Sequence, residues 1–202
     1  MQAPQKPHQP LIVLDFGSQV TQLIARRIRE LGVYAEILPF HTSIEVIRSR
    51  NPVAVILSGG PASIGIEGAP KLNPAVLDLG VPVLGICYGL YAIVDALGGS
   101  ISAAREREFG AATLTVDAAR GPMTAFTPGV PEPVWMSHGD QVDRLPPGFE
   151  TVAHTKTCVH AAIVDRTRHF WGVQFHPEVT HTRRGSEVIA AFLDAAGFTR
   201  DW

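Results

Sequence analysis

The fold is decided largely by residues 81–94, which read VPVLGICYGLYAIV. An apolar run of strand length, residues 82–86, leads into Gly-Ile-Cys-Tyr-Gly, and the apolar residues that follow recur at helical spacing. A strand, a tight turn and a helix therefore meet at Cys87.

The residues before this stretch repeat the same order of elements. Strands are expected at residues 11–14, 33–39, 53–57 and 82–86, and helices at about 20–31, 43–50, 74–79 and 88–97. Alternation of this kind is typical of a parallel sheet with helices on both faces, whose functional groups collect at the carboxyl ends of the strands. The sequence therefore predicts the α/β class, with a mostly parallel central sheet flanked by helices.

The second half of the chain has a different pattern. Short strand-like runs at residues 111–116, 133–136, 151–154, 161–164 and 169–174 follow one another without helices between them, before a last helix at about 184–196. We interpret this half as an antiparallel extension of the same domain.

Composition excludes several classes of function. A length of 202 residues, 46% of them hydrophobic, suits the core of one α/β domain. The net charge of -2 predicts no broad attraction to nucleic acid or to a membrane surface, and no apolar run approaches the roughly 20 residues of a membrane helix. Residues 1–10 are polar and proline-rich and predict a disordered leader without a secretory signal. With only two cysteines, a cytoplasmic protein with a small-molecule or protein partner is expected.

Cys87 stands in a turn that can activate a thiol. The Gly-x-Cys-x-Gly pattern resembles the nucleophile elbow of α/β hydrolases. Gly85 and Gly89 allow close backbone approach, and the start of the helix brings N–H groups and positive dipole near the sulfur, which favours the thiolate. A buried structural cysteine is the alternative, because a nucleophile also needs a base and an oxyanion hole.

Two further stretches offer the base and the oxyanion hole. If the backbone of VQFHPE, residues 173–178, is extended, His176 and Glu178 project to the same side, and Glu178 can orient the imidazole. His-Pro-Glu is also common in surface loops. The turn Ser-Gly-Gly-Pro, residues 58–61, could aim a backbone N–H at the same pocket and complete an oxyanion hole with the Tyr88 N–H, or be an ordinary turn.

Together these motifs resemble the class I glutamine amidotransferase family. The stretches ILSGGP (56–61) and GICYG (85–89) carry the general resemblance. LDFGSQ (14–19), VWMSHGD (134–140) and FHPEVTHT (175–182) are similar, more narrowly, to the glutaminase domains of bacterial two-domain GMP synthetases. The resemblance implies a flavodoxin-like amidotransferase fold across residues 11–198.

The resemblance also implies hydrolysis of the glutamine side-chain amide. Cys87 would form a γ-glutamyl thioester, His176 would act as acid and base, and Glu178 would orient the imidazole. The backbone amides of Gly60 and Tyr88 would hold the oxyanion. The substrate-binding residues implied or expected are Gly59, Tyr91, Ser137, His138, Gly139 and Asp140, the last four of them in a turn for which a hairpin loop is the alternative.

A partner follows from the same resemblance. An ATP pyrophosphatase (synthetase) domain or subunit would adenylate XMP and use the ammonia to form GMP, with ATP and Mg bound there. No cofactor and no metal are expected in residues 11–198. Residues 199–202 resemble the start of a linker to that absent domain, so an excised domain and a separate subunit are both open.

One position departs from the family. Where the family has methionine and glutamine after the elbow, this chain has Leu90 and Tyr91. Residue 91 lies one helical turn after Cys87 on the same face, so its side chain should approach the pocket, where tyrosine offers one hydroxyl in place of an amide. Two other functions are therefore kept open: a catalytically weakened regulatory or binding module of GMP synthetase, and another γ-glutamyl hydrolase on the same fold.

Overall fold

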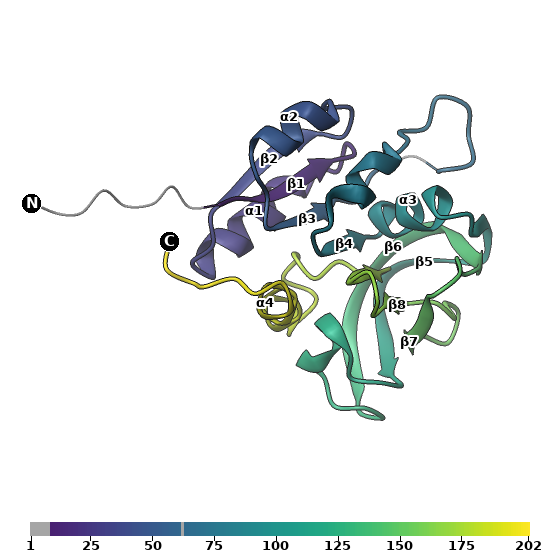
Figure 1. Ribbon diagram of the computed structural model, residues 1–202. Coiled ribbons are helices and arrows are strands. Elements are labelled where there is room, and N and C mark those ends of the chain that lie inside the picture. Colours follow the sequence, from purple (N-terminus) through teal and green to yellow (C-terminus); the bar gives the residue numbers. More distant parts are fainter. Residues whose placement is uncertain (1–8, 62) are drawn as a thin grey trace, which may run out of the picture.

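The computed structural model describes residues 9–61 and 63–202, which build one nine-stranded sheet with helices packed on its faces (Figure 1). The strands are β1 (Leu11–Asp15), β2 (Ala35–Pro39), β3 (Ala54–Leu57), β4 (Val83–Ile86), β5 (Ser100–Val116), β6 (Pro131–Arg144), β7 (Glu150–His154), β8 (Ala162–Asp165) and β9 (Phe170–Val173). The α-helices are α1 (Thr21–Glu30), α2 (Ile44–Ser49), α3 (Tyr88–Ala96) and α4 (Gly185–Ala195), with 3-10 helices η1 (Pro74–Leu79) and η2 (Gly121–Ala125). The predicted α/β class is confirmed.

The sheet has the strand order β2-β1-β3-β4-β9-β8-β7-β5-β6. The first five strands in this order pair in parallel, and the remaining pairs are antiparallel. The central parallel strands are apolar on both faces because both faces are covered. In β1, Leu11 and Val13 pack into the core cluster beneath α1 and α4, whereas Ile12 and Leu14 pack into the cluster that includes α3.

The antiparallel extension is confirmed for β5 to β8, but β9 differs from the expectation. It pairs in parallel with β4 and lies in the middle of the sheet. Apolar periodicity reports burial and does not report the direction of the neighbouring strand, so this placement was not evident from the pattern. Because the carboxyl ends of parallel strands meet at one edge, the residues after β9 lie beside those after β4.

Strands β5 and β6 are much longer than predicted. They pair along most of their lengths, with a register shift between Ala103 and Glu108. The outer part of β5 is rich in charge and mostly exposed, so it lacks the apolar alternation that indicates a strand. As a consequence, residues 137–140, expected to form a turn, lie within β6.

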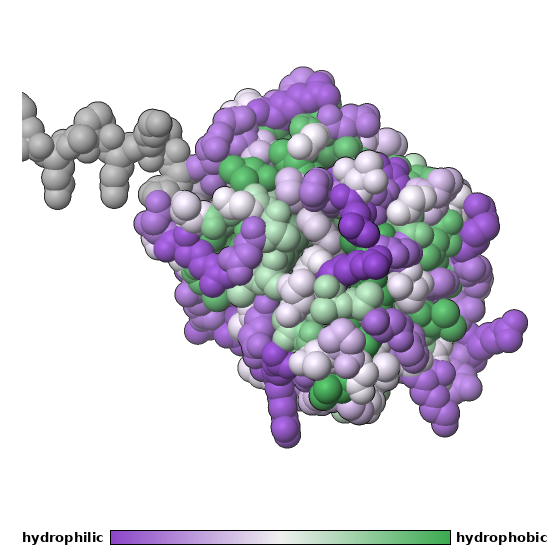
Figure 2. All heavy atoms as spheres, turned by 60° about the horizontal axis from the view of Figure 1, so that its bottom comes forward, coloured by the Kyte–Doolittle hydropathy of each residue, from purple (hydrophilic) through white to green (hydrophobic). Residues whose placement is uncertain are grey.

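On the face shown in Figure 2, hydrophilic side chains predominate, with smaller hydrophobic areas between them. Among the described residues, none of the helices combines the length and the apolar character that crossing a membrane requires. The first eight residues of the predicted leader lie outside the described part of the chain.

Candidate active site

Cys87 lies in a strained turn between β4 and α3. Its φ of 52° is in the left-handed region, which costs a non-glycine residue about 1–3 kcal/mol and is typical of functional sites. Gly85 and Gly89 are required by close packing. A Cβ atom on Gly85 would overlap the Gly89 backbone, and one on Gly89 would lie 2.7 Å from the Leu57 carbonyl carbon. The sequence thus bends at Cys87 and packs the start of α3 directly onto β3.

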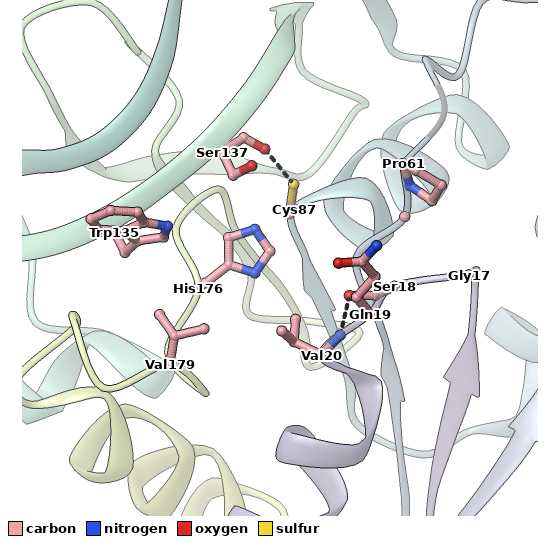
Figure 3. Close-up of a pocket in the computed structure, with 11 residues that line it drawn as sticks. Gly17, Ser18, Gln19, Val20, Pro61, Cys87, Trp135, Ser137, His176 and Val179 are labelled. Carbon is pink, nitrogen blue, oxygen red and sulfur yellow. Dashed lines mark hydrogen bonds between the residues drawn. The ribbon is translucent and has the colours of Figure 1, made fainter.

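The pairing of β4 with β9 brings the catalytic candidates together. The Cys87 amide donates to the Val173 carbonyl oxygen at 2.8 Å, and the chain then runs three residues to His176. Figure 3 shows the imidazole beside the Cys87 sulfur. His176 Nδ1 lies 2.8 Å from Glu178 Oε1, and the Glu178 side chain is fully buried. The three predicted residues therefore form one cluster.

The route to that cluster is not the predicted one. Strand β9 ends at Val173, and Pro177 and Glu178 lie in a turn. Side-chain alternation along an extended strand therefore does not explain the contact between His176 and Glu178. Instead, the turn at Pro177 folds the carboxylate back onto the imidazole.

The environment favours a charged imidazole. Burial disfavours the imidazolium, but interactions with Cys87 and then with Glu178 outweigh burial and raise the pKa of His176 to about 10. At neutral pH the ring then holds a proton that it can deliver to a leaving group. The other cysteine has no such environment, because burial and the nearby Glu108 raise the pKa of Cys158 to about 12.

Two cavities meet at Cys87, and both are also lined by Gly60, Pro61 and Ser137. The first, the His176-side cavity, has a volume of about 300 Å³ and is drawn in Figure 3; its further lining includes Trp135 and residues 17–20. The second, the Tyr91-side cavity, has a volume of about 410 Å³. Its further lining includes Tyr88, Tyr91, Arg107, His138, Gly139 and Asp140.

The predicted oxyanion hole and Gly59 surround Cys87. Tyr88 is the first residue of α3, so its amide has no partner within the helix. Gly60 lines both cavities. Gly59 faces the histidine: a Cβ atom there would lie 3.3 Å from His176 Cε1, which shows that glycine leaves room for the imidazole.

Strand β6 forms the far wall of the Tyr91-side cavity. The Asp140 carboxylate accepts from the Ser63 hydroxyl at 2.6 Å, and its carbonyl oxygen accepts from the Tyr91 hydroxyl at 2.5 Å. Tyr91 therefore lines the pocket, as its position predicted, and its ring is tied to β6. Burial raises the pKa of the Tyr91 hydroxyl, so it remains a neutral donor.

Gln174 is a neighbour of the sulfur to which the sequence analysis gave no role. Its Nε2 donates to Cys87 Sγ at 3.6 Å, and the Cys87 thiol lies 3.5 Å from the Ser137 carbonyl oxygen. Gln174 is buried and directly follows β9. The signal that could have identified it is a polar residue at the carboxyl end of an apolar buried strand.

Replacement of Glu178 by glutamine is expected to lower the pKa of His176 from about 10 towards 6.5, because the carboxylate is among the groups that raise it. A histidine pKa that is raised on folding stabilises the protein fully below pH 6.5, and that contribution is lost as the pH rises to about 10. The native protein should therefore lose more stability across this window than Glu178→Gln. NMR titration of the His176 ring and melting temperatures across the same window measure both effects. The surface control Glu187→Gln should leave the His176 titration unchanged, and an unchanged titration in Glu178→Gln would contradict this account.

Comparisons with known proteins agree with this geometry. The sequence model of the glutamine amidotransferase class-I family matches residues 12–196. The chain is 51% identical over 200 residues to a glutamine-hydrolysing GMP synthase of Mycobacterium tuberculosis, and 48% identical over 198 residues to one of Heliobacterium modesticaldum. Each alignment covers 98% of this chain and 38% of the relative, so the chain spans well under half the length of these curated relatives.

Solved structures show the same fold. A GMP synthase subunit of Thermoplasma acidophilum superposes with a TM-score of 0.77 at 28% identity, covering 95% of this chain and 96% of that one. A glutamine amidotransferase of Methylobacillus flagellatus has a TM-score of 0.72 at 16% identity, covering 93% and 95% of the two chains. At that identity the second likeness concerns the fold alone.

Proposed function

This chain belongs to the class I glutamine amidotransferase family, and from that membership we propose that it hydrolyses the side-chain amide of glutamine at Cys87. The observation that carries the proposal is the positive φ of Cys87 at the end of β4, beside a His176–Glu178 pair delivered by the parallel neighbour β9. A purely structural cysteine needs neither the strained backbone nor the charged histidine.

The geometry supports a two-step reaction. The Cys87 thiolate attacks the amide carbon, and the resulting oxyanion is held by the amides of Gly60 and Tyr88. His176 gives its proton to the leaving nitrogen, which departs as ammonia and leaves a γ-glutamyl thioester. Water then attacks the thioester and passes a proton to His176, so that glutamate is released and the thiolate and imidazolium are restored. Glu178 holds the ring in place throughout.

We propose that glutamine occupies the Tyr91-side cavity. Its wall contains most of the residues that the family resemblance assigns to substrate binding, namely Tyr91, Ser137, His138, Gly139 and Asp140. Because Cys87 also lines this cavity, an amide placed there can reach the sulfur. The His176-side cavity then leaves space for the attacking water and the departing ammonia.

We further infer that the ammonia serves the conversion of XMP to GMP by a synthetase domain or subunit, where ATP and Mg would bind. The relatives named glutamine-hydrolysing GMP synthase support this. Only 38% of each relative is covered by this chain, so the greater part of their length leaves room for such a domain. We place the reaction in the cytoplasm, because both cysteines are free thiols, as is usual in reducing compartments.

One observation favours a second function. Tyr91 is 3% exposed, lines the substrate cavity and is tied to Asp140, so its ring takes up space next to the sulfur. A ring in that position could exclude glutamine and leave a regulatory or binding module.

Labelling of Cys87 by diazo-oxo-norleucine, an electrophilic mimic of glutamine, separates the two functions. We expect one adduct on the native protein by intact mass, slowed by added glutamine, and a rate in Tyr91→Gln within about tenfold of the native rate, since one polar contact is worth about 1–1.5 kcal/mol. Tyr91→Phe is the matched control, because it keeps the ring and removes only the hydroxyl, with its hydrogen bonds to Asp140 and Gln174. Labelling of Tyr91→Gln alone would reject the glutaminase and support the binding module.

A further inference from the structure

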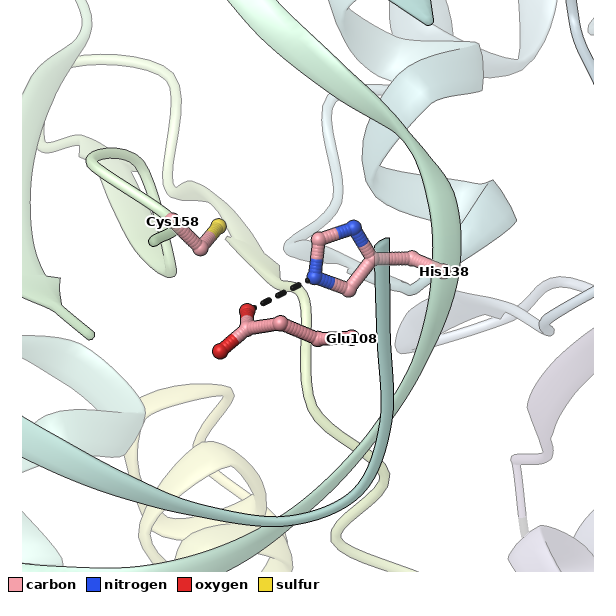
Figure 4. A group of neighbouring side chains, drawn as sticks. All are labelled: Glu108, His138 and Cys158. Carbon is pink, nitrogen blue, oxygen red and sulfur yellow. Dashed lines mark hydrogen bonds and ion pairs between the residues drawn. The ribbon is translucent and has the colours of Figure 1, made fainter. Parts of the chain in front are cut away.

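A second cluster of cysteine, histidine and glutamate lies behind the wall of the Tyr91-side cavity. Glu108 of β5, His138 of β6 and Cys158 of the segment between β7 and β8 each place one ligand atom within 4.8 Å of the other two. Figure 4 shows the three functional groups turned towards a common centre. His138 and Cys158 are each 4% exposed. None of the three is Cys87, His176 or Glu178, although Cys158 is close enough to Cys87 for the two thiols to interact electrostatically.

The hydrogen bonds of His138 define the side of the ring that faces this centre. Its Nδ1 lies 2.8 Å from the Asp140 carbonyl oxygen, which can only accept, so Nδ1 carries a proton. In the neutral ring Nε2 then has a lone pair, and it lies 2.9 Å from Glu108 Oε2, another acceptor. Two lone pairs at that distance need a cation between them. One proton, on the imidazole or on the carboxyl, would satisfy this pair alone, whereas a metal ion would also engage the sulfur.

The surrounding groups orient the ligands as outer-shell partners do in metal sites. The Thr155 hydroxyl donates to Glu108 Oε1 at 3.1 Å and accepts from the Cys158 amide at 3.0 Å, which links the carboxylate to the loop that carries the thiol. The main-chain amide of His160 hydrogen-bonds to the Cys158 sulfur. A histidine ligand held by its other nitrogen on a carbonyl, together with hydrogen-bonded sulfur and carboxylate ligands, is the usual arrangement around a bound metal.

We propose that Glu108, His138 and Cys158 form a zinc-binding site. Thiolate, imidazole and carboxylate are the ligands that zinc takes, and three protein ligands leave a fourth, tetrahedral position for water. Two ligand atoms at about 2.0 Å from a tetrahedral ion lie about 3.3 Å apart, so His138 and Glu108 need to separate by only a few tenths of an ångström. The Cys158 sulfur lies within 4.8 Å of both, and it has to approach to about 3.5 Å, the spacing set by a Zn–S bond of about 2.3 Å. Binding replaces the proton of the Cys158 thiol, which passes to solvent.

Such an ion would act on the substrate pocket through β6. His138 lines the Tyr91-side cavity and hydrogen-bonds to the same Asp140 carbonyl oxygen that accepts from Tyr91. Zinc would therefore fix the wall against which glutamine is proposed to bind. No metal was expected from the sequence, because these ligands come from three separate elements and have no local metal-binding spacing.

Cobalt titration of the chelator-treated protein tests the site. Cobalt takes the place of zinc and reports a sulfur ligand by thiolate-to-metal absorption. We expect the native protein and Cys87→Ser to bind one equivalent of cobalt with this absorption, and Cys158→Ser to lose the absorption. Added zinc should displace the bound cobalt, which elemental analysis measures. Cys87→Ser is the matched control, since it removes the other thiol and the other cluster of cysteine, histidine and glutamate.

Other outcomes of the cobalt titration reject the site. Absorption that disappears in Cys87→Ser would place the metal at the catalytic cysteine, and absorption that persists in Cys158→Ser would exclude that thiol. Absence of cobalt and zinc binding to the native protein would show that a proton alone joins His138 to Glu108. If Cys158→Ser does not fold, Glu108→Gln decides the matter, because it keeps the side-chain shape. Zinc affinity lowered at least about tenfold supports the site, and unchanged affinity overturns it.

Discussion

Replacement of Cys87 by alanine is expected to reduce glutamine hydrolysis by on the order of 10⁴–10⁶-fold, as removal of a nucleophile does in enzymes with covalent intermediates. Without the sulfur no thioester forms, and His176 has no thiolate to pair with. The Gly60 and Tyr88 amides and both cavities remain, so glutamine should still bind. The measurement is glutamate release over time, alongside glutamine binding by calorimetry.

The binding measurement is the internal control. Alanine adopts the same backbone at position 87 and adds no atoms, so the glutamine affinity should stay close to that of the native chain. The melting temperature at neutral pH should fall, because Cys87 is the group that most raises the pKa of His176. Hydrolysis above about one hundredth of the native rate would contradict Cys87 as the nucleophile. Loss of binding together with activity would show that the substitution had changed the pocket as well as the chemistry.

The elbow could be predicted from the sequence because its determinants are local. A buried strand, glycines on both sides of Cys87 and a helical apolar pattern follow one another within residues 81–94, and short-range sterics fix how they join. The structure gives each of these residues the place that the pattern indicated, including the close approach of Gly89 to β3.

The position of β9 could not be predicted because it depends on pairing between distant strands. Hydrophobic periodicity does not set the order of strands within a sheet, and the apolar run of β9 suits a central strand in either direction. His176 nevertheless reaches Cys87, since parallel pairing with β4 brings both chain ends to one edge. The contact between His176 and Glu178 was predicted from strand alternation, and the structure makes it through a turn.

The wall of the pocket could not be predicted from the sequence for the same reason. The lengths of β5 and β6 follow from long-range pairing across a charged, exposed segment, so the strand character of residues 137–140 was not visible in the sequence. The hydrogen bond between Tyr91 and Asp140 and the cluster of Glu108, His138 and Cys158 both depend on that pairing. Neither has a signal in local spacing.

Replacement of Gly89 by alanine is expected to lower the stability of the protein by at least about 3 kcal/mol and the melting temperature by about 6–12 °C. The added Cβ atom would lie 2.7 Å from both the carbonyl carbon and the Cβ of Leu57, and backbone cannot move aside as a flexible side chain can. Alanine favours a helix over glycine by only about 1 kcal/mol, which is too little to offset the overlap. Relief requires α3 to move away from β3, and this would displace Cys87 from His176, so hydrolysis should fall as well.

Gly65→Ala is the matched control for this prediction. Among the described residues other than its chain neighbours, no atom lies within 4 Å of the Cβ position at Gly65, and its backbone is outside the left-handed region. We expect its melting temperature to stay within about 2 °C of the native value, or to rise slightly, because alanine reduces the freedom of the unfolded chain. Thermal unfolding followed by circular dichroism compares the two variants. Equal melting temperatures would mean that the contact between α3 and β3 is loose, and that the glycines around Cys87 serve the strained turn alone.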